Sequence, residues 1–429
     1  MLRFNENNEV IRQDEYKAIL VGLQTNEDIS YSMEELKGLA EAANVEVLGQ
    51  MTQNLERANT ATLIGKGKVE ELAELVRNME ADTVIFNDEL TGMQLRNLED
   101  AVGVRVIDRT ILILDIFADR ASSREGKLQV ELAQLKYRMP RLTGFGKSLS
   151  RLGGGIGTRG PGEKKLETDR RHIEKRMLDI KEELDHIKNT RNVQRARREK
   201  NEVPVVALVG YTNSGKSALM NRILAKTEKN EEERKIVFEK NMLFATLDVA
   251  QRSVMLDSNH QFILIDTVGF VSKLPHSLVN AFKATLEEVT YADLLIHVVD
   301  SNYENHDFHI DVTDQVLKEI GAGDKDRVLA FNKIDLVDPE TVVPRPGTEY
   351  MMISAKEDIH IDELMELIRS KIFSDEVRAS LLIPYSRGDI SSYLCEKAEV
   401  FVMDYQEEGT YFEVNMKNAD YQRLKEYEV

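Results

Sequence analysis

The sequence contains few of the features that mark secreted or membrane-bound proteins. Its single cysteine, Cys395, excludes an internal disulfide framework and any metal site built from several cysteines of one chain. We interpret this thiol as a packing residue. The first residues include Arg3, Glu6 and Glu9 and form no apolar core, and no stretch approaches about 18 apolar residues. We therefore expect no signal peptide, no membrane span and a cytoplasmic location.

Positive charge is also scarce over the chain as a whole. The 57 Lys and Arg are outnumbered by 75 Asp and Glu, and the net charge of −18 argues against indiscriminate binding to nucleic acid. The charge is distributed unevenly, however, which permits a local basic surface. A chain of 429 residues with 42% hydrophobic and 31% charged residues is globular in composition and long enough for about two to four domains.

What the sequence does contain is a phosphate-binding motif in residues 205–221. Four apolar β-formers precede GYTNSGKS, which fits the P-loop pattern G-x-x-x-x-G-K-[ST], and helix-forming residues follow it. The glycines let successive N–H groups face a polyphosphate at a helix N-terminus. We expect Lys216 to reach the β- and γ-phosphates and the Ser217 hydroxyl to bind Mg²⁺. The alternative, a glycine-rich turn that matches by chance, is disfavoured by the flanking strand and helix. The candidate nucleotide-binding residues here are Gly210, Tyr211, Thr212, Asn213, Ser214, Gly215, Lys216 and Ser217.

Three further motifs follow in the order that a GTP-binding domain requires. Asp266 ends an apolar strand and can hold the Mg²⁺ shell, while Gly269 lets the next peptide approach the γ-phosphate. After another strand, the Asp335 carboxylate of N-K-x-D can accept hydrogen bonds from the ring N–H and the amine of guanine, a pair of donors that adenine lacks. Residues 354–356 are expected to close over the base. The candidate residues are Asp266, Thr267, Val268, Gly269, Asn332, Lys333, Asp335, Ser354, Ala355 and Lys356.

A threonine between the first two motifs suits the segment that closes on Mg²⁺ and the γ-phosphate. A charged stretch, residues 228–240, leads to Phe244, Ala245 and Thr246, which we take as further GTP-binding residues. Thr246 is also a candidate direct Mg²⁺ ligand. The candidate catalytic residues are Lys216, Thr246 and Gly269.

The residue after D-x-x-G is unusual for a GTPase. Many GTPases place glutamine there to orient the attacking water, but here the residue is Phe270, which cannot do so by hydrogen bonding. We therefore expect slow intrinsic turnover and external acceleration. The amide oxygen of Asn213 could ligate a monovalent cation, and similarity to other GTPases with this asparagine makes K⁺ the candidate. The alternative is that Asn213 only holds the loop by hydrogen bonds.

The rest of the chain predicts an α/β multidomain protein. Residues 1–120 alternate strands (16–22, 45–48, 82–86, 104–107) with helices (33–43, 68–79, 94–102), which indicates an N-terminal α/β subdomain with a mainly parallel sheet. Within it, the glycines and lysines of residues 64–68 are expected to form a turn that opens a helix, with a nucleotide or nucleic-acid contact as the alternative. A P-loop GTPase domain of the TRAFAC type is expected over residues 203–372. A small α+β C-terminal subdomain is expected over residues 373–429, with strands at 380–384, 399–403 and 410–415.

Two helical runs indicate an antiparallel helical hairpin over residues 121–202. The first covers residues 124–137 and the second residues 166–200, in which Ile173, Ile180 and Ile187 share one heptad position. Arg191 occupies the other apolar position near the end of the second run.

Between these runs, residues 143–162 hold eight glycines in twenty residues. Residues 136–165 carry eight Lys and Arg against one acid, a local net charge of +7 in a chain at −18. Arginine pairs with phosphate, and folded RNA offers irregular phosphate surfaces to a flexible basic loop, so we predict an RNA contact here. The alternative is a solvated linker. The candidate RNA-binding residues are Arg151, Gly153, Gly154, Gly155, Ile156, Gly157, Arg159 and Gly160.

These motifs together resemble the HflX family of translational GTPases. The resemblance is carried by residues 125–135 (EGKLQVELAQL), 140–142 (PRL), 153–162 and 162–171 (GEKKLETDRR), beside the GTP motifs. It implies a GTPase that hydrolyses GTP to GDP and phosphate with Mg²⁺ and binds the large (50S) ribosomal subunit. It also implies dissociation of stalled or idle ribosomes, a hairpin loop that enters ribosomal RNA, and a C-terminal subdomain that docks elsewhere on the ribosome. Away from the ribosome we expect a monomer.

Other functions have sequence requirements that separate them from this one. A GTPase in rRNA or tRNA maturation or in ribosome assembly would share the same motifs and is the main alternative. A tRNA-modifying enzyme would call for a second catalytic centre, for which Cys395 is a poor candidate. A scaffolding GTP-binding protein would not need the basic loop.

Overall fold

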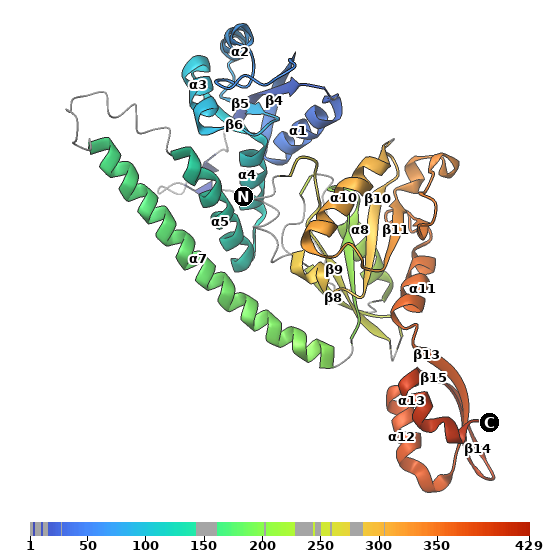
Figure 1. The fold of residues 1–429 in the computed structure, drawn as a ribbon. Coiled ribbons are helices and arrows are strands. Elements are labelled where there is room, and N and C mark those ends of the chain that lie inside the picture. Colours follow the sequence, from blue (N-terminus) through green and yellow to red (C-terminus); the bar gives the residue numbers. More distant parts are fainter. Residues whose placement is uncertain are drawn as a thin grey trace. The chain divides into compact units, whose positions relative to one another are not determined.

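A computed structural model describes the chain except for residues 1–2, 5–9, 12–15, 27, 143–160, 201–202, 228–242, 245–249, 258–259, 275–285 and 304. Two compact units form (Figure 1). The first comprises Met1–Ala196, Lys240–Asp248 and Val268–Leu286, and the second Arg197–Glu239, Val249–Thr267 and Glu287–Val429. No described helix has the length and apolar character needed to cross a membrane.

The first unit contains the four-stranded parallel sheet that the sequence predicts. The strands are β3 (Tyr16–Gln24), β4 (Val45–Asn54), β5 (Thr83–Phe86) and β6 (Arg105–Asp108), in the order β4-β3-β5-β6. The interior of β3 is apolar because both of its neighbours and both sheet faces exclude water. The connecting helices are α1 (Ser30–Ala42), α2 (Lys66–Met79) and α3 (Gly92–Val102). A short antiparallel pair, β1 (Arg3–Phe4) and β2 (Val10–Ile11), precedes them.

Three features of this unit differ from the expectation, and the first is the pair β1 and β2, which the sequence did not predict. Strand β4 continues to Asn54, well past the expected end at Leu48. A further helix, α4 (Arg109–Arg120), follows β6 directly, and the Asp108 side chain caps it by accepting from the Ile111 N–H at 3.0 Å. Gly65 is the N-cap of α2, which begins at Lys66, so residues 64–68 open a helix as the sequence predicts.

The predicted helical hairpin is present as α5 (Arg124–Leu142) and α7 (Pro161–Lys200). Its two helices run antiparallel, since Glu131 of α5 binds Arg176 of α7 at 2.7 Å, whereas Arg124, earlier in α5, binds Glu183, later in α7, at 2.6 Å. An apolar seam of Leu128, Leu132 and Ile180 lies between them, with Leu135, Met177, Leu184 and Ile187 packed against it. Figure 1 shows α7 as the long green helix beside α5.

The second unit contains a six-stranded sheet in the order β12-β11-β10-β7-β9-β8. Its strands are β7 (Val205–Val209), β8 (Ala250–Met255), β9 (Gln261–Asp266), β10 (Leu294–Asp300), β11 (Arg327–Asn332) and β12 (Tyr350–Met352). All pairings are parallel except that of β8 with β9. The sequence did not predict β8, an edge strand whose exposed residues give it little apolar pattern.

Helices cover both faces of this sheet. Helix α8 (Lys216–Thr227) and helix α11 (Ile361–Ile372) share one apolar core with Val328 and Ala330 of β11. Ile310 of helix α10 (His306–Ile320) packs with Leu329 and Phe331, which point to the opposite face because side chains alternate along a strand. Short 3₁₀ turns, Ile334–Leu336 and Pro339–Thr341, follow β11. The result is a doubly wound α/β fold.

A small antiparallel sheet ends the chain. Strands β13 (Glu376–Ile383), β15 (Gly409–Lys417) and β14 (Glu399–Gln406) lie in that order, with helices α12 (Gly388–Lys397) and α13 (Asn418–Leu424). Helix α12 buries Ile390 and Leu394, which are one turn apart, and this places the next residue, Cys395, on the exposed side. The interpretation of Cys395 as a packing residue is therefore wrong.

Candidate GTP-binding site

The loop after β7 has a backbone that only glycine can adopt at two positions. Gly210 has φ of 144°, and a Cβ there would lie 2.2 Å from the Val298 carbonyl oxygen. Gly215 has φ of 95°, and a Cβ there would lie 2.2 Å from Asn332 Nδ2. Both glycines are therefore required by close approach and by positive φ. Strand β7 lies between β10 and β9 in the sheet, and this loop follows its carboxyl end. Doubly wound sheets bind their ligands at the carboxyl ends of their strands.

Lys216 is the first residue of α8 and is buried beneath this loop. Its Nζ donates to the carbonyl oxygens of Gly210 at 3.0 Å and Tyr211 at 2.8 Å. Burial lowers the pKa of the Lys216 ammonium to about 8, while the nearby Asp266 carboxylate acts in the opposite direction. The loop thus holds a cation at a helix N-terminus, an arrangement that suits a polyphosphate.

Two side chains with oxygen atoms that could ligate a metal ion meet at the same end of the sheet. Asp266 is the last residue of β9, and its Oδ2 accepts a hydrogen bond from Ser217 Oγ at 2.6 Å. The pairing of β7 with β9 places Asp266 opposite Leu208, and Thr267 Oγ1 donates to the Leu208 carbonyl at 2.7 Å. A hydroxyl and a carboxylate are ligand types that Mg²⁺ prefers, so these two residues fit a magnesium site.

The predicted guanine motif is joined to the phosphate loop by one side chain. Asn332 Nδ2 donates to the Ser214 carbonyl at 2.9 Å, and Asn332 Oδ1 accepts from the Ala355 N–H at 3.0 Å. Ser354 Oγ donates to Asp335 Oδ1 at 2.6 Å, which fixes the carboxylate that we expect to read guanine. Three segments far apart in sequence therefore meet around Asn332.

Lys333 has a partner that the sequence did not predict. Its Nζ binds Asp300 Oδ2 at 2.7 Å, and its own φ is 66°. Asp300 ends β10 and lies opposite Asn332 in the sheet. Its position at the carboxyl end of a strand was the available signal, since ligand-binding residues gather there.

The remaining predicted residues lie in the phosphate loop, in the first unit or outside the described residues. Asn213 lies in the phosphate loop and is exposed, with φ of 61°. Phe244 belongs to the first unit, where its ring is buried edge-on against Phe117 at 4.6 Å. Gly269 and the buried Phe270 also belong to the first unit. Ala245 and Thr246 lie outside the described residues, as do all eight candidate RNA-binding residues, from Arg151 to Gly160.

Two other places among the described residues could be taken for ligand sites. Asp257, His260 and Glu399 offer ligand atoms within 4.8 Å of one another, but the Arg369 guanidinium already binds Asp257 at 3.3 Å and Glu399 at 2.9 Å. The Arg369 guanidinium therefore already contacts both carboxylates of this cluster.

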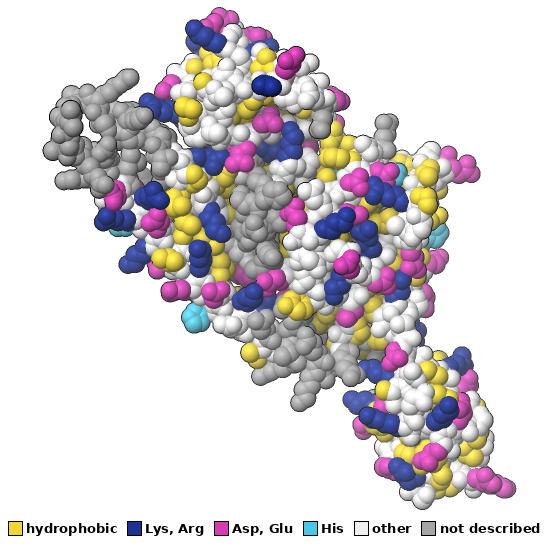
Figure 2. All heavy atoms as spheres, viewed as in Figure 1, with side chains coloured by type: hydrophobic (Ala, Val, Ile, Leu, Met, Phe, Trp, Pro, Cys, Tyr) yellow, Lys and Arg dark blue, Asp and Glu magenta, His cyan; other side chains and the backbone are white. Residues whose placement is uncertain are grey.

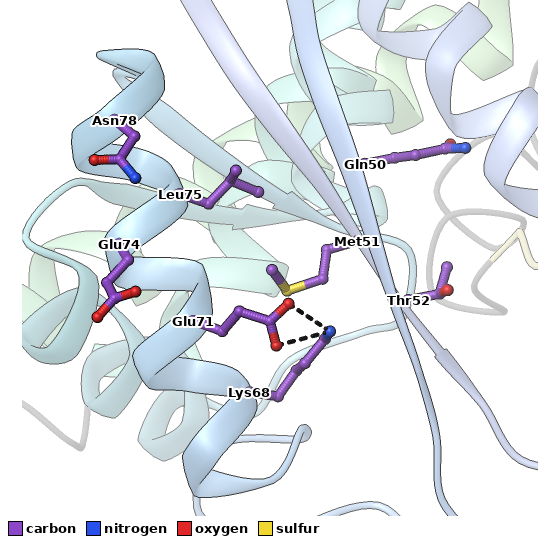
Figure 3. A pocket seen from close by; sticks show the side chains of 8 residues that line it. All are labelled: Gln50, Met51, Thr52, Lys68, Glu71, Glu74, Leu75 and Asn78. Carbon is purple, nitrogen blue, oxygen red and sulfur yellow. Dashed lines mark hydrogen bonds and ion pairs between the residues drawn. The ribbon is translucent and has the colours of Figure 1, made fainter.

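A pocket of about 490 Å³ also lies between β4 and α2 in the first unit (Figure 3). Lys68 binds both oxygens of Glu71 at 2.9 Å there, and Glu74 adds a second acid, so the lining does not favour phosphate.

Comparisons with known proteins agree with this geometry. Three protein-family models match: "GTP-binding GTPase N-terminal" over residues 30–118, "GTP-binding GTPase Middle Region" over 120–198 and "50S ribosome-binding GTPase" over 205–333. The chain is similar to "GTPase HflX" of Caldanaerobacter subterraneus subsp. tengcongensis, with 49% identity over 98% of this chain and 95% of that protein. It is also similar to "GTPase HflX" of Lacrimispora saccharolytica, with 43% identity over 94% of this chain and 93% of that protein.

Among solved structures, the chain is similar to a GTP-binding protein from Sulfolobus solfataricus in complex with GDP. The identity is 25%, the match covers 84% of this chain and 99% of that one, and the TM-score is 0.44.

Proposed function

The chain belongs to the HflX family of GTPases and hydrolyses GTP, and from this premise we propose that it binds the large ribosomal subunit and dissociates stalled or idle ribosomes. The observation that carries the proposal is the joining of the phosphate loop to N-K-x-D through Asn332, in a domain that matches a 50S ribosome-binding GTPase. A protein that works on ribosomes is expected in the cytoplasm, and as a monomer when off the ribosome.

The proposed roles of the site residues follow from their chemistry. The N–H groups of residues 210–217 bind the phosphates, with Lys216 placed to neutralise charge on the transferred group. Asp335, oriented by Ser354, reads the two donors of guanine, and Ala355 and Lys356 cover the base. Ser217 and Asp266 would hold Mg²⁺ together with Thr246. When bound, Mg²⁺ supplies neutralisation of phosphate charge.

The residue after D-x-x-G, where many GTPases have a glutamine that orients the attacking water, distinguishes this chain from those GTPases. Phe270 is apolar and 1% exposed, so it offers no hydrogen bond to a water. We propose that Asn213 ligates K⁺, since its amide is exposed on the phosphate loop, and that the ribosome provides further acceleration.

We propose four functional parts that follow the boundaries expected from the sequence: residues 1–120, 121–202, 203–372 and 373–429. The RNA contact is assigned to the basic segment between the hairpin helices. Helix α5 ends at Leu142 and α7 begins at Pro161, so residues 143–160 connect the two antiparallel helices. On the face drawn in Figure 2, the described basic and acidic side chains are interspersed and form no extended basic patch. A segment with a local excess of positive charge is therefore the better candidate for RNA.

The test is co-sedimentation with purified 50S subunits in GTP and in GDP, together with a ribosome-splitting assay. Arg151→Ala with Arg159→Ala removes two proposed phosphate contacts, so binding should weaken and its salt dependence should flatten. Replacing Gly153, Gly154 and Gly155 by alanine keeps every charge but restricts the backbone by about 0.5–1 kcal/mol per residue, so seating and splitting should fail first.

A matched control is Arg96→Ala with Arg105→Ala, which removes two arginines of the first unit that pair with Asp100 and Asp115, outside the basic segment and the motifs that carry the family resemblance. The control should bind and split ribosomes like the unaltered protein, and GTP affinity without ribosomes should be unchanged in all variants. Unaltered 50S binding and splitting by both loop variants would show that the segment is a linker. Binding to 50S precursors without splitting of 70S ribosomes would favour the assembly alternative.

A further inference from the structure

Three aromatic rings stack behind the phosphate loop. The His309 imidazole of α10 lies face to face with the Tyr211 ring at 3.9 Å between centroids and 13° between planes. On its other side it faces the Tyr303 ring at 4.2 Å and 10°. Tyr211 and His309 are only 2% and 7% exposed. The imidazole is thus held between two phenol rings that come from different loops.

The inner ring of this stack belongs to the residue that anchors Lys216. The Tyr211 carbonyl accepts the Lys216 Nζ hydrogen bond at 2.8 Å, and Tyr211 directly follows Gly210, whose φ of 144° favours glycine. A shift of the Tyr211 ring would therefore move both the backbone that binds phosphate and an acceptor of the buried ammonium. Packed side chains transmit such shifts because interiors have little free space.

The ring on the other side of His309, that of Tyr303 (the outer ring), is connected to the guanine motif through its own loop. Asp300, three residues before Tyr303, binds Lys333 at 2.7 Å, and the Ser301 N–H donates to the Asn332 carbonyl at 2.9 Å. The stack therefore lies between the loop that binds phosphates and the strand end that presents N-K-x-D. Asn332 makes the same connection by hydrogen bonds, and the stack is a second and separate one.

His309 suits this place because it is uncharged there. Burial, with the nearby charges of His306 and Lys333, lowers the pKa of His309 to about 4. A neutral imidazole is flat, fits between two phenol rings and has no charge to desolvate. The helix also holds the residue, since the His309 carbonyl accepts from Thr313 Oγ1 at 2.9 Å.

We infer that His309 is a positioning residue for GTP hydrolysis, which holds Tyr211 in place and, with Tyr303, couples the phosphate loop to the guanine motif. The inference rests on the GTPase activity of the family and is independent of any ribosome contact. His309 acts through Tyr211 and Lys216 on the reacting phosphates.

The test compares His309→Ala with His309→Phe in the full chain without ribosomes. His309→Ala opens the stack, so the Kd for GDP should rise about five- to tenfold, and kcat for GTP should fall because Lys216 loses a fixed acceptor. His309→Phe keeps a flat ring and should restore the Kd to within about twofold of the unaltered protein. If His309 only stabilised the fold, the two variants would have the same Kd for GDP once both are folded.

A matched control is Ile310→Ala, the next residue of α10, which is 2% exposed and packs with Leu329 and Phe331 outside the stack. It should lower the melting temperature but change the Kd for GDP less than twofold. If His309→Ala proves unstable, Tyr303→Ala removes the half-buried outer ring and should raise the Kd in the same direction. The inference is overturned if Ile310→Ala loses GDP affinity as much as His309→Ala does. It is also overturned if His309→Phe fails to restore affinity, or if folded His309→Ala or Tyr303→Ala binds GDP normally.

Discussion

Lys216 carries its charge where water scarcely reaches it, and this has a measurable consequence for nucleotide binding. Burial lowers its pKa to about 8, so a substantial fraction of the side chain is neutral at pH 8.5. The phosphates of GDP or GTP favour the ammonium and raise this pKa. The bound state then holds more protons than the free state at pH values above about 8, so binding takes up a proton there and affinity rises as pH falls through this window. Below about pH 7 both states are protonated and the uptake vanishes.

Calorimetry of GDP binding in buffers of different ionisation enthalpy measures this uptake. We expect a fraction of a proton at pH 8.5 and almost none at pH 6.5. Lys216→Arg is the matched variant, because arginine keeps its proton throughout this range and any remaining binding should take up none. Equal heats in all buffers at pH 8.5 would contradict the assignment.

Asn213 allows a second test at the level of one residue. Replacing Na⁺ by K⁺ should raise GTP turnover, because the exposed amide of the phosphate loop is placed to ligate a monovalent cation. Asn213→Ala should remove the difference. Since φ at this position is 61°, Asn213→Gly is the better variant, as glycine lacks the amide but tolerates this conformation. Equal rates in both salts, with GTP binding shown in each, would reject the cation.

At the level of elements, the α5–α7 hairpin depends on a narrow apolar seam. Ile180 is fully buried against Leu128 and Leu132, so Ile180→Ala should destabilise the hairpin by about 2–5 kcal/mol. Leu178 lies on the same helix but is 59% exposed, and Leu178→Ala should change stability by no more than about 0.5 kcal/mol. Proteolysis of α5 and α7 over a urea series measures both, and similar shifts in the two variants would contradict the packing.

The sequence pattern predicted most elements of the fold because their burial is periodic. The parallel strands of the two larger sheets and the two hairpin helices follow from apolar spacing. Arg191 is accommodated at an apolar heptad position by an ion pair with Glu125. Helix α4 was missed because its residues are apolar on most sides, and it is packed within the first unit. Strand β8 was missed for the opposite reason: burial alternates along it, but Arg252 lies on its less exposed side and Met255 on its exposed side, so its apolar residues do not alternate.

The candidate site divides in the same way. The P-loop, D-x-x-G and N-K-x-D are local patterns, so their residues could be named from the sequence. Asp300 and the stack of Tyr211, Tyr303 and His309 depend on which loops meet after folding. No spacing rule links a histidine inside a helix to a tyrosine of a loop about 100 residues earlier.

At the level of the whole molecule, the first unit gathers segments that are far apart in the chain. Phe244 packs on Phe117 of α4, and Ser272 lies in a buried polar network with Glu35 of α1 and Arg109 of α4. Arg109 also donates to Asn87 Oδ1 at 3.0 Å. The segment that follows D-x-x-G is thus held through Ser272, which is hydrogen-bonded to both members of the ion pair between α1 and α4. Glu35 and Ser272 are 237 positions apart in the sequence.

The buried ion pair between Arg109 and Glu35 gives the last prediction. Their side chains are 3% and 2% exposed, so removing one partner leaves a charge without compensation and water cannot replace it. Arg109→Met should therefore destabilise the first unit by about 3–5 kcal/mol. Arg109→Met with Glu35→Leu should recover much of that loss, because two apolar side chains of similar volume leave no unpaired charge.

Because a chain of several domains need not unfold in one step, hydrogen exchange of peptides from α1 and α4 is the suitable measurement. Ser272→Ala removes only one hydroxyl from the network and should cost about 1 kcal/mol. If the double variant exchanges as fast as Arg109→Met alone, the instability comes from lost packing at Arg109, and the charge balance of the pair is not what holds these segments together.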